Sequence, residues 1–312
     1  MPELPEVETV RVRLEPLLVG RRFDRVEIRD PRVTRPVEPL EVAAELEGET
    51  VAALERRGKY LVVRFESGRV LLIHLRMTGT MRHERDGAPE HDPHLRVVVT
   101  LDDGSDVIYR DVRRFGTWLL LEPGEDIPYL AQRLGEEPLT RAFTPASLAA
   151  RFDRRRAPVK AALLDQRAAA GMGNIYADEA LWRAQIHPLR PAGDLDEEEL
   201  KRLHKAVREA LKAGIARQGT TLRDYVGAGR PVVAARDGIV EALELHHGAS
   251  AAAEPVTYEG NFVRVRHADG TVATYAHLQH RSVGVIVGEA VREGQVLANS
   301  GATGDVEEPH LH

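Results

Sequence analysis

Apolar residues recur every three or four positions near the start of the chain, at Val7, Val10, Leu14 and Leu17. This spacing is typical of one face of a helix, and Gly20 follows it as a stop signal. Pro2 and Pro5 fit a helix only in or before its first turn. The pattern therefore predicts an N-terminal helix over residues 2–19.

The chain then changes to a pattern typical of β-strands. Between Phe23 and Leu121, short runs rich in β-branched and other apolar residues follow one another: YLVVRF, RVLLIHL, LRVVVTL and TWLLL. The sequence DDG at 102–104 stands directly after one such run and has the composition of a hairpin turn. These features predict an antiparallel β region behind the N-terminal helix.

A second change of pattern marks a helical region. Residues 122–140 are typical of a connector, and Ala-, Leu-, Arg- and Glu-rich stretches after it predict helices near 145–152, 158–168, 174–184 and 195–219. Valine, glycine and turn residues then return, and 7 of the 13 histidines lie in the last part of the chain. We therefore predict a multidomain α and β protein with three parts, β, α and β, at residues 1–130, 131–229 and 230–312.

Composition narrows the class of protein. A chain of 312 residues with 43% hydrophobic and 29% charged residues is ordinary for a folded globular protein of two or three domains. No apolar run has the length of a membrane span, and the N-terminus lacks the order of a secretion signal, so we expect a cytoplasmic protein. The absence of cysteine excludes disulfides, thiolate catalysis and cysteine-ligated zinc.

Charge is distributed unevenly. The net charge is −6, but residues 230–312 account for −5 of it, with 6 arginines and no lysine against 11 acidic residues. The first 229 residues are nearly neutral and cluster their basic residues in RRGKY (56–60), YRDVRRFG (109–116) and RFDRRRAPVK (151–160). Such local basic patches can bind phosphates even on a neutral protein.

Seven motifs in the first 229 residues occur in a characteristic order: MPELPEVETV, RRGKYL, HLRMTG, YRDVRRFG, GMGNIYADEAL, IHP and QGTTLRDYV. In this order they resemble formamidopyrimidine-DNA glycosylase, a bifunctional base-excision enzyme. The resemblance implies an N-terminal β-sandwich, a helix-two-turn-helix domain and a cleft that binds double-stranded DNA carrying an oxidised purine or an abasic site. We also expect the protein to be a monomer.

The resemblance assigns chemistry to the first residues. After removal of the initiator Met, Pro2 offers a secondary amine, and an α-amino group has a pKa of about 8, so a useful fraction is unprotonated near neutrality. In the family this amine attacks C1′ of the damaged nucleotide, with Glu3 as the adjacent acid/base and Lys59 as a proton donor for β-elimination. Without the resemblance, PELPE is also typical of a helix start, where glutamates are favoured by the helix dipole. Lys59 is then typical of a solvated lysine in a strand.

Further positions match family residues around this site. Glu6 and Glu179 match acidic positions, although each can also be a surface helix glutamate. Met77, Arg113 and Phe115 match the trio that fills the gap left by a flipped base; taken separately, Met77 and Phe115 are typical of a core.

The remaining matches concern phosphate contacts. Asn174 matches a contact at a helix start, where free N–H groups favour anions. Arg155 and Lys160 are expected to contact phosphates, with an exposed charge run as the alternative. A DNA-contacting histidine corresponds to His94 or His91, and we prefer His94 because it adjoins the predicted strand.

The last part of the chain departs from this family. The four-cysteine zinc finger that normally follows is excluded, which predicts weak DNA affinity and poor δ-elimination. Instead, GRPVVAARDGIVEAL, GNFVRVRHADGTVATYAHL, VGEAVREGQVLANSGATG and PHLH resemble a zinc endopeptidase domain of the LytM or lysostaphin type. The zinc ligands are incomplete, because the H-x-x-x-D motif is missing upstream.

Few histidines of residues 230–312 correspond to the metal-binding or catalytic histidines of that peptidase family. His312 is the one matching ligand, and His277 and His310 match water-activating histidines. His246 and His247 are adjacent and are more typical of a solvated turn. We expect a degenerate, inactive peptidase-like module and assign no cofactor.

Three hypotheses follow for the function. The first is a DNA glycosylase and AP lyase for oxidised purines, because the start PELPE resembles that branch more than the PEGPE start of the pyrimidine-lesion branch. The second is a DNA-binding protein of the same fold without catalysis. The third is a zinc peptidase with residues 1–229 as a passenger.

Overall fold

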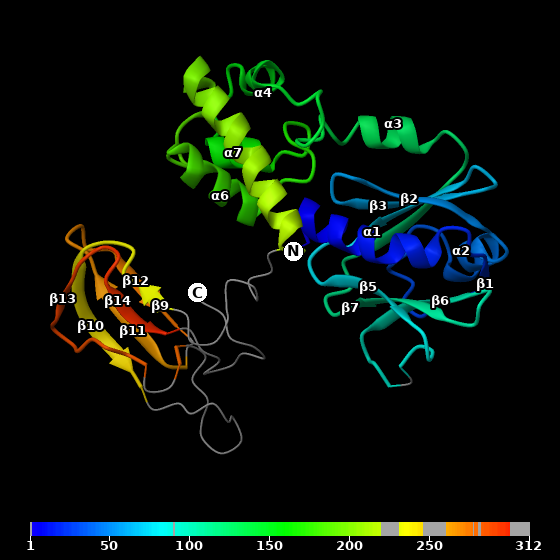
Figure 1. Ribbon diagram of the computed structural model, residues 1–312, viewed down its shortest axis with the longest axis horizontal. Coiled ribbons are helices and arrows are strands. Elements are labelled where there is room, and N and C mark those ends of the chain that lie inside the picture. The colour runs from blue at the N-terminus through cyan, green and yellow to red at the C-terminus, as the bar shows by residue number, and fades with distance from the viewer. Residues whose placement is uncertain are drawn as a thin grey trace. The chain divides into compact units, whose positions relative to one another are not determined.

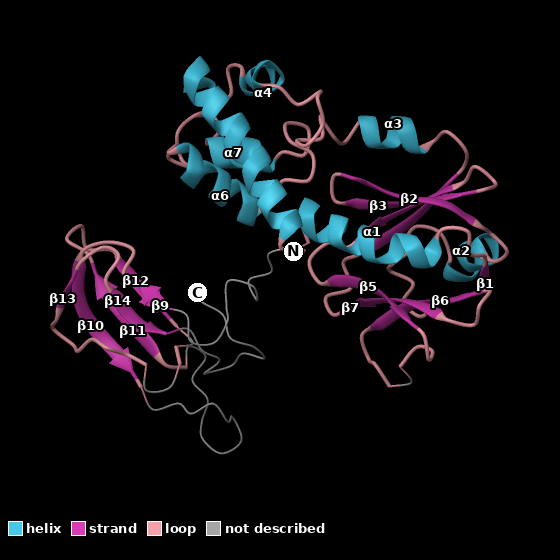
Figure 2. Cartoon of the chain, viewed as in Figure 1, coloured by secondary structure: helices cyan, strands magenta, loops and turns pink. Residues whose placement is uncertain are grey.

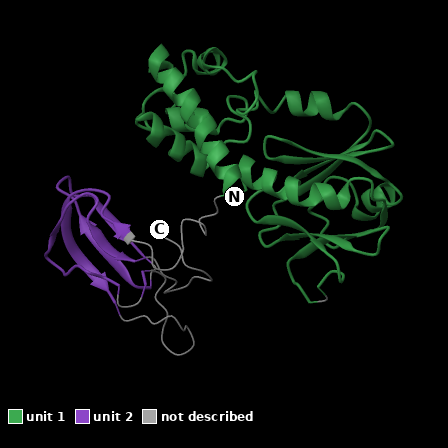
Figure 3. Ribbon diagram, in the orientation of Figure 1, with its two compact units in different colours: residues 1–219 green, residues 220–312 purple. Residues whose placement is uncertain are grey.

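The computed structural model divides into two compact units, residues 1–219 and 220–312 (Figure 3). It describes residues 2–89, 91–219, 231–245, 260–276, 278–279 and 282–299. The predicted boundary between residues 229 and 230 lies outside the described residues.

The first unit opens with α1 (Leu4–Leu18), as predicted, and Pro5 occupies its first turn. A β-sandwich of two four-stranded antiparallel sheets follows (Figures 1 and 2). One sheet has the order β1 (Phe23–Ile28), β6 (Leu95–Leu101), β7 (Asp106–Asp111), β5 (Gly79–Glu84). The other has the order β2 (Val51–Arg57), β3 (Tyr60–Phe65), β4 (Val70–His74), β8 (Thr117–Leu121).

The core of the sandwich explains the strand pattern. Phe23 of the first sheet meets Phe65 of the second edge to face, with ring centroids 5.4 Å apart. α1 packs on the same core through Val7, Leu14 and Leu18, so Leu18 is buried in place of the predicted Leu17, which is exposed. The predicted hairpin turn at 102–104 is confirmed, with Gly104 at φ +83° between β6 and β7.

Two helices of the first unit were not predicted from the sequence. α2 (Pro39–Leu46) interrupts the β region, and α3 (Asp126–Ala131) lies within the expected connector. In α2, Val42, Ala43 and Leu46 are buried against the sandwich core. A helix of two turns shows too few periods for its apolar face to stand out in the sequence, so packing against the sandwich decides its conformation.

The helical part of the first unit contains α4 (Pro145–Phe152), α5 (Val159–Leu164), α6 (Asn174–Ala184), a 3₁₀ turn η1 (Ala192–Asp194) and α7 (Glu197–Ala216). Capping boxes begin two of these helices: Thr144 caps α4 and Asp196 caps α7. α6 and α7 pack closely, since a Cβ on Gly214 of α7 would lie 2.5 Å from the ring of Tyr176.

The second unit is a small all-β structure. β12 (Val272–Tyr275), β11 (Phe262–Arg266), β10 (Gly238–Glu244) and β13 (Ala290–Val291) form one sheet, and β14 (Val296–Asn299) pairs with β9 (Pro231–Val233). Its core is rich in valine. The predicted fold class, with a β-sandwich, a helical domain and a small β module, is confirmed. Among the described residues, no helix combines the length and apolar character that crossing a membrane requires.

Candidate active site

The start of the chain lies against the first turn of α6. Glu3, only 2% exposed, accepts hydrogen bonds from the N–H groups of Ile175 (2.9 Å) and Tyr176 (3.4 Å). These N–H groups have no acceptor inside their own helix, and the positive end of the helix favours an anion. Glu3 is therefore anchored to a helix from the other domain, beside Pro2, which is partly exposed.

Two glycines allow this close approach. A Cβ on Gly173 would lie 2.3 Å from Cδ of Glu3, and a Cβ on Gly171 would lie 2.6 Å from Cβ of Leu4. The backbone N–H of Leu4 donates to the carbonyl of Gly171 at 3.0 Å. Gly171 also has φ +92°, a conformation that favours glycine. The N-terminal residues thus pack directly against the backbone of the GMGN segment.

Replacing Gly173 by alanine is expected to displace the Glu3 carboxylate. Forcing a methyl group into this space should cost about 1–3 kcal/mol and lower the melting temperature of the first unit by roughly 5 °C. Thermal melting measures this effect. Gly284→Ala is the matched control, because its Cβ would meet only the carbonyl oxygen of Leu297 at 4.0 Å. A Gly173→Ala protein that melts like the unchanged protein contradicts this prediction.

Lys59 lies at the tip of the β2–β3 hairpin and is 6% exposed, so it is not a solvated strand lysine. The preceding turn is held by Glu137 of the interdomain connector. The Glu137 carboxylate accepts from the backbone N–H of Gly58 and pairs with Arg56 (2.9 Å) and Arg57 (3.2 Å). The connector therefore fixes the backbone that carries Lys59.

Burial and charge shift the acid–base properties of this site. Burial raises the pKa of Glu3, against the opposing effects of the Ile175 N–H and the Lys59 charge. Burial also lowers the pKa of Lys59, although the charges of Glu3 and Glu6 oppose that shift. Glu3 therefore keeps a proton, and Lys59 releases one, more readily than in water. Opposite shifts in neighbouring groups are typical of sites for proton transfer.

His74 is a buried neighbour of this site that the sequence analysis did not single out, although it begins the motif HLRMTG. Burial, with the charges of Arg76 and Lys59, lowers the pKa of His74 to about 3. Its Nδ1 accepts a hydrogen bond from the backbone N–H of Arg76 at 3.0 Å. His74 is therefore a neutral imidazole at neutral pH, with its remaining proton on Nε2.

The two supporting glutamates are placed differently. Glu6 accepts from the backbone N–H of Glu3 (2.8 Å) and from the hydroxyl of Tyr176 (2.8 Å), so it joins the start of α1 to α6. Glu179 lies in the second turn of α6 and forms an ion pair with Arg183 at 2.7 Å. The structure thus connects Glu6 directly to Glu3, whereas Glu179 holds a neighbouring arginine of its own helix.

The three residues predicted to fill the gap of a flipped base come together at the surface. Met77 is 41% exposed, Phe115 is 54% exposed, and Arg113 lies between them. Nη1 of Arg113 is 3.3 Å from Sδ of Met77, and its guanidinium lies 5.6 Å from the centroid of the Phe115 ring. The alternative interpretation, that Met77 and Phe115 are core residues, is therefore wrong. We call these three side chains the wedge.

The backbone of His94 is hydrogen-bonded next to the loop that carries two of the wedge residues. Its carbonyl accepts the backbone N–H of Asp111 at 3.0 Å, directly before the loop that carries Arg113. His91 is exposed in the preceding turn and lies farther along the chain from β6. This placement favours His94 as the histidine beside the wedge.

The predicted phosphate contacts lie on the helical part. Asn174 is exposed at the first position of α6. Arg155 pairs with Asp165 at 2.9 Å, and Lys160 pairs with Asp178 at 2.8 Å. Both cations are about one-third exposed, so they can reach a phosphate by exchanging a carboxylate for it.

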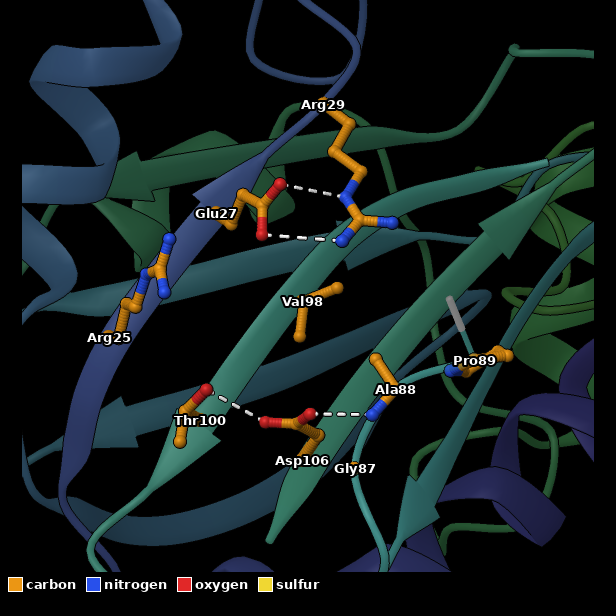
Figure 4. A pocket seen from close by; sticks show the side chains of 9 residues that line it. All are labelled: Arg25, Glu27, Arg29, Gly87, Ala88, Pro89, Val98, Thr100 and Asp106. Atoms are coloured by element: carbon orange, nitrogen blue, oxygen red, sulfur yellow. Dashed lines mark hydrogen bonds and ion pairs between the residues drawn. The ribbon is translucent and has the colours of Figure 1, made fainter. Parts of the chain in front are cut away.

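A pocket of about 390 Å³ lies elsewhere, on the face of the β1–β6–β7–β5 sheet opposite the core (Figure 4). Its charged groups are mostly satisfied by each other: Arg29 donates to Glu27, and Asp106 accepts from Thr100 and from the N–H of Ala88. None of the residues predicted from the motifs lines it. The candidate active site is therefore the cluster around Pro2, Glu3 and Lys59.

The chain has no cysteine, so its residues do not fit the four-cysteine zinc finger of the first family that the sequence resembles. Within the described ranges, no three His, Asp or Glu side chains are grouped as metal ligands. The histidines singled out in the second unit lie outside the described residues: His246, His247, His277, His310 and His312.

Comparison with known protein families finds three matched regions along the chain. Residues 1–118 match the formamidopyrimidine-DNA glycosylase N-terminal domain, residues 134–226 match its H2TH domain, and residues 217–312 match peptidase family M23. These matches confirm both resemblances.

Curated relatives named formamidopyrimidine-DNA glycosylase cover the first two domains. The relative from Symbiobacterium thermophilum is 50% identical over 226 residues, which span 72% of this chain and 73% of the relative. The relative from Bacillus subtilis is 44% identical over 230 residues, spanning 73% of this chain and 83% of the relative.

Solved structures show the same fold. The Lactococcus lactis glycosylase, bound non-covalently to DNA containing an AP site, has a TM-score of 0.68 at 30% identity and is covered over 99% of its length and 89% of this chain. A structure of MutM in complex with DNA containing carbocyclic 8-oxo-G also has a TM-score of 0.68 at 30% identity, with 88% of this chain and 97% of that chain covered.

Proposed function

Because the chain belongs to the formamidopyrimidine-DNA glycosylase family of enzymes, we propose that it removes oxidised purines, such as formamidopyrimidines and 8-oxoguanine, from double-stranded DNA and then cleaves the strand. The observation that carries this proposal is the cluster of Pro2, Glu3 and Lys59. It combines Pro2, which is a secondary amine once the initiator Met is removed, with two buried groups whose pKa values are shifted in opposite directions, up for Glu3 and down for Lys59.

The first step is base release. The lone pair of the Pro2 nitrogen forms a bond to C1′ of the damaged nucleotide, and the bond from C1′ to the base breaks. The proton that the Pro2 nitrogen loses balances the one that the departing base gains. Burial favours the protonated form of Glu3, so Glu3 can supply a proton as the sugar ring opens. The product of this step is an iminium ion between Pro2 and C1′.

The second step is strand cleavage. The positive iminium nitrogen withdraws electrons and makes the C2′ proton acidic. Water takes that proton, and its electron pair moves into a C1′–C2′–C3′ unsaturated system and expels the 3′ phosphate. Lys59, an ammonium in a buried site, is suited to give a proton to the departing group. Hydrolysis of the iminium then releases the enzyme.

Contacts with DNA are divided among the surface residues. The wedge fills the space left by the extruded nucleotide, and His94 contacts the DNA. Asn174, Arg155 and Lys160 bind phosphates and set the register of the duplex. We propose that the enzyme binds DNA weakly and favours β-elimination over δ-elimination, because the chain has no cysteines to build the family's zinc finger.

Borohydride trapping tests the proposal. An abasic duplex incubated with the protein and borohydride should give a covalent protein–DNA complex, because borohydride reduces the iminium to a stable amine. The alternative is a DNA-binding protein without catalysis. It predicts binding that weakens steeply with salt, no trapped complex and no strand cleavage, and that result would reject the proposed activity.

A further inference from the structure

The wedge is built from two loops that are far apart in the sequence. Met77 lies in the turn between β4 and β5, whereas Arg113 and Phe115 lie in the loop between β7 and β8. The backbone N–H of Arg113 donates to Oγ1 of Thr78 at 3.0 Å. The hydroxyl of Thr78 in turn donates to Oδ1 of Asp111 in a short hydrogen bond. These two bonds link the turn and the loop, and we call them the Thr78–Asp111 relay.

The other oxygen of Asp111 holds the far end of the same loop. Oδ2 accepts from the backbone N–H groups of Phe115 (2.9 Å) and Gly116 (2.8 Å), and from the hydroxyl of Tyr109 at 3.3 Å. Asp111 is 1% exposed. A buried carboxylate requires such donors, and here the donors are the backbone of the wedge loop itself.

The loop has little room to move while these bonds are present. A Cβ on Gly116 would lie 1.6 Å from the hydroxyl oxygen of Tyr109, so the backbone packs directly on the buried phenol. On the outer side, Arg114 pairs with Asp30 through two hydrogen bonds of 2.6 and 2.9 Å. The side chains of Arg113 and Phe115 are thus exposed, whereas the backbone that carries them is held by buried hydrogen-bond partners.

We infer that Thr78 and Asp111 are positioning residues that hold Met77, Arg113 and Phe115 as one preorganised wedge for extruding a damaged base. This inference rests on the proposed function. Extrusion costs stacking and pairing energy, and a wedge that is already ordered spends none of its binding energy on ordering loops. The relay should therefore affect most the rate of reactions in which a base must leave the stack.

The inference predicts a split between two substrates. Base release from an 8-oxoguanine duplex requires extrusion of a stacked and paired base, whereas cleavage of a preformed abasic site does not. Thr78→Val keeps the shape of the side chain but removes the hydroxyl, which leaves the N–H of Arg113 and one oxygen of Asp111 without this partner. Base release should slow by about tenfold or more, because both hydrogen bonds of the relay are lost, while abasic-site cleavage should change less than about twofold.

Thr78→Ser is the matched control, because serine keeps the hydroxyl, and it should retain base release within about twofold of the unchanged protein. Fluorescence of 2-aminopurine placed opposite the lesion reports opening of the stack, and its rise should be slower in Thr78→Val. Thermal melting shows whether each variant is folded. If Thr78→Val does not fold, Thr78→Ala, which only truncates the side chain, takes its place.

Each outcome bears on a separate claim. Equal rates for the Val and Ser variants overturn the inference, and so does an equal slowing of both reactions in Thr78→Val. A protein that cleaves neither substrate even when unchanged instead refutes the proposed function. The two failures are therefore distinguishable.

Discussion

Replacing Glu3 by glutamine is expected to slow base release from an 8-oxoguanine duplex by about 10²–10⁴-fold, the usual contribution of a general acid or base. The carboxyl is buried, its pKa is raised by that burial, and it lies beside the N-terminal amine. Glutamine retains the shape and one oxygen acceptor for the N–H groups of α6, so the fold should persist. Single-turnover kinetics measure the rate of base release.

A preformed abasic site should distinguish chemistry from damage to the fold. Its sugar opens to an aldehyde in water by itself, so Pro2 can form the iminium without release of a base, and Glu3→Gln should retain much of this reaction. Glu6→Gln is the matched control, since Glu6 touches Glu3 and Tyr176 but faces no reacting atom in the proposed mechanism. Equal base release by Glu3→Gln and Glu6→Gln would remove Glu3 from the mechanism.

Replacing Lys59 by methionine is the second large change. Methionine fills a similar volume but carries no proton, so strand cleavage should fall by about 10²-fold. A proton donor is protonated below its pKa, and it loses that proton, and with it its function, as the pH rises through the pKa. Because burial lowers the pKa of Lys59 from its ordinary 10.5, cleavage by the unchanged protein should fall on the alkaline side below that pH.

The pH profile checks this assignment. In Lys59→Met the residual cleavage should lack that alkaline fall, because the titrating group is gone. The acidic side should remain in both proteins, since the Pro2 amine must lose a proton to attack and an α-amino group has a pKa of about 8. An unchanged alkaline fall in Lys59→Met would assign it to another group.

The hydrophobic pattern predicted those elements that are long enough for their helical or strand periodicity to be recognised in the sequence. The apolar stripe of α1 and the β-branched runs of the sandwich are long, so periodicity alone identified them. α2 and α3 are short, and their conformation depends on packing that the sequence does not display. Motif order, rather than periodicity, identified Pro2 and Glu3.

The supporting residues were beyond sequence reasoning for a physical reason. Glu137 acts on the Lys59 turn across a separation of 79 residues, and Thr78 meets Asp111 across 33. Asp111 and Thr78 were inside quoted motifs, but nothing in their local sequence indicates burial or partners. Likewise, the burial of Lys59 depends on tertiary contacts, so the sequence left open a solvated lysine that the structure excludes.

The position of the trapped bond tests the central claim most directly. After borohydride trapping on an abasic duplex and digestion with trypsin, mass spectrometry should find the adduct on the N-terminal peptide that ends at Arg11, attached to the Pro2 nitrogen. Pro2→Gly should give much less adduct. An adduct on the peptide that contains Lys59, or an equal yield from Pro2→Gly, would contradict the assignment of Pro2 as the nucleophile.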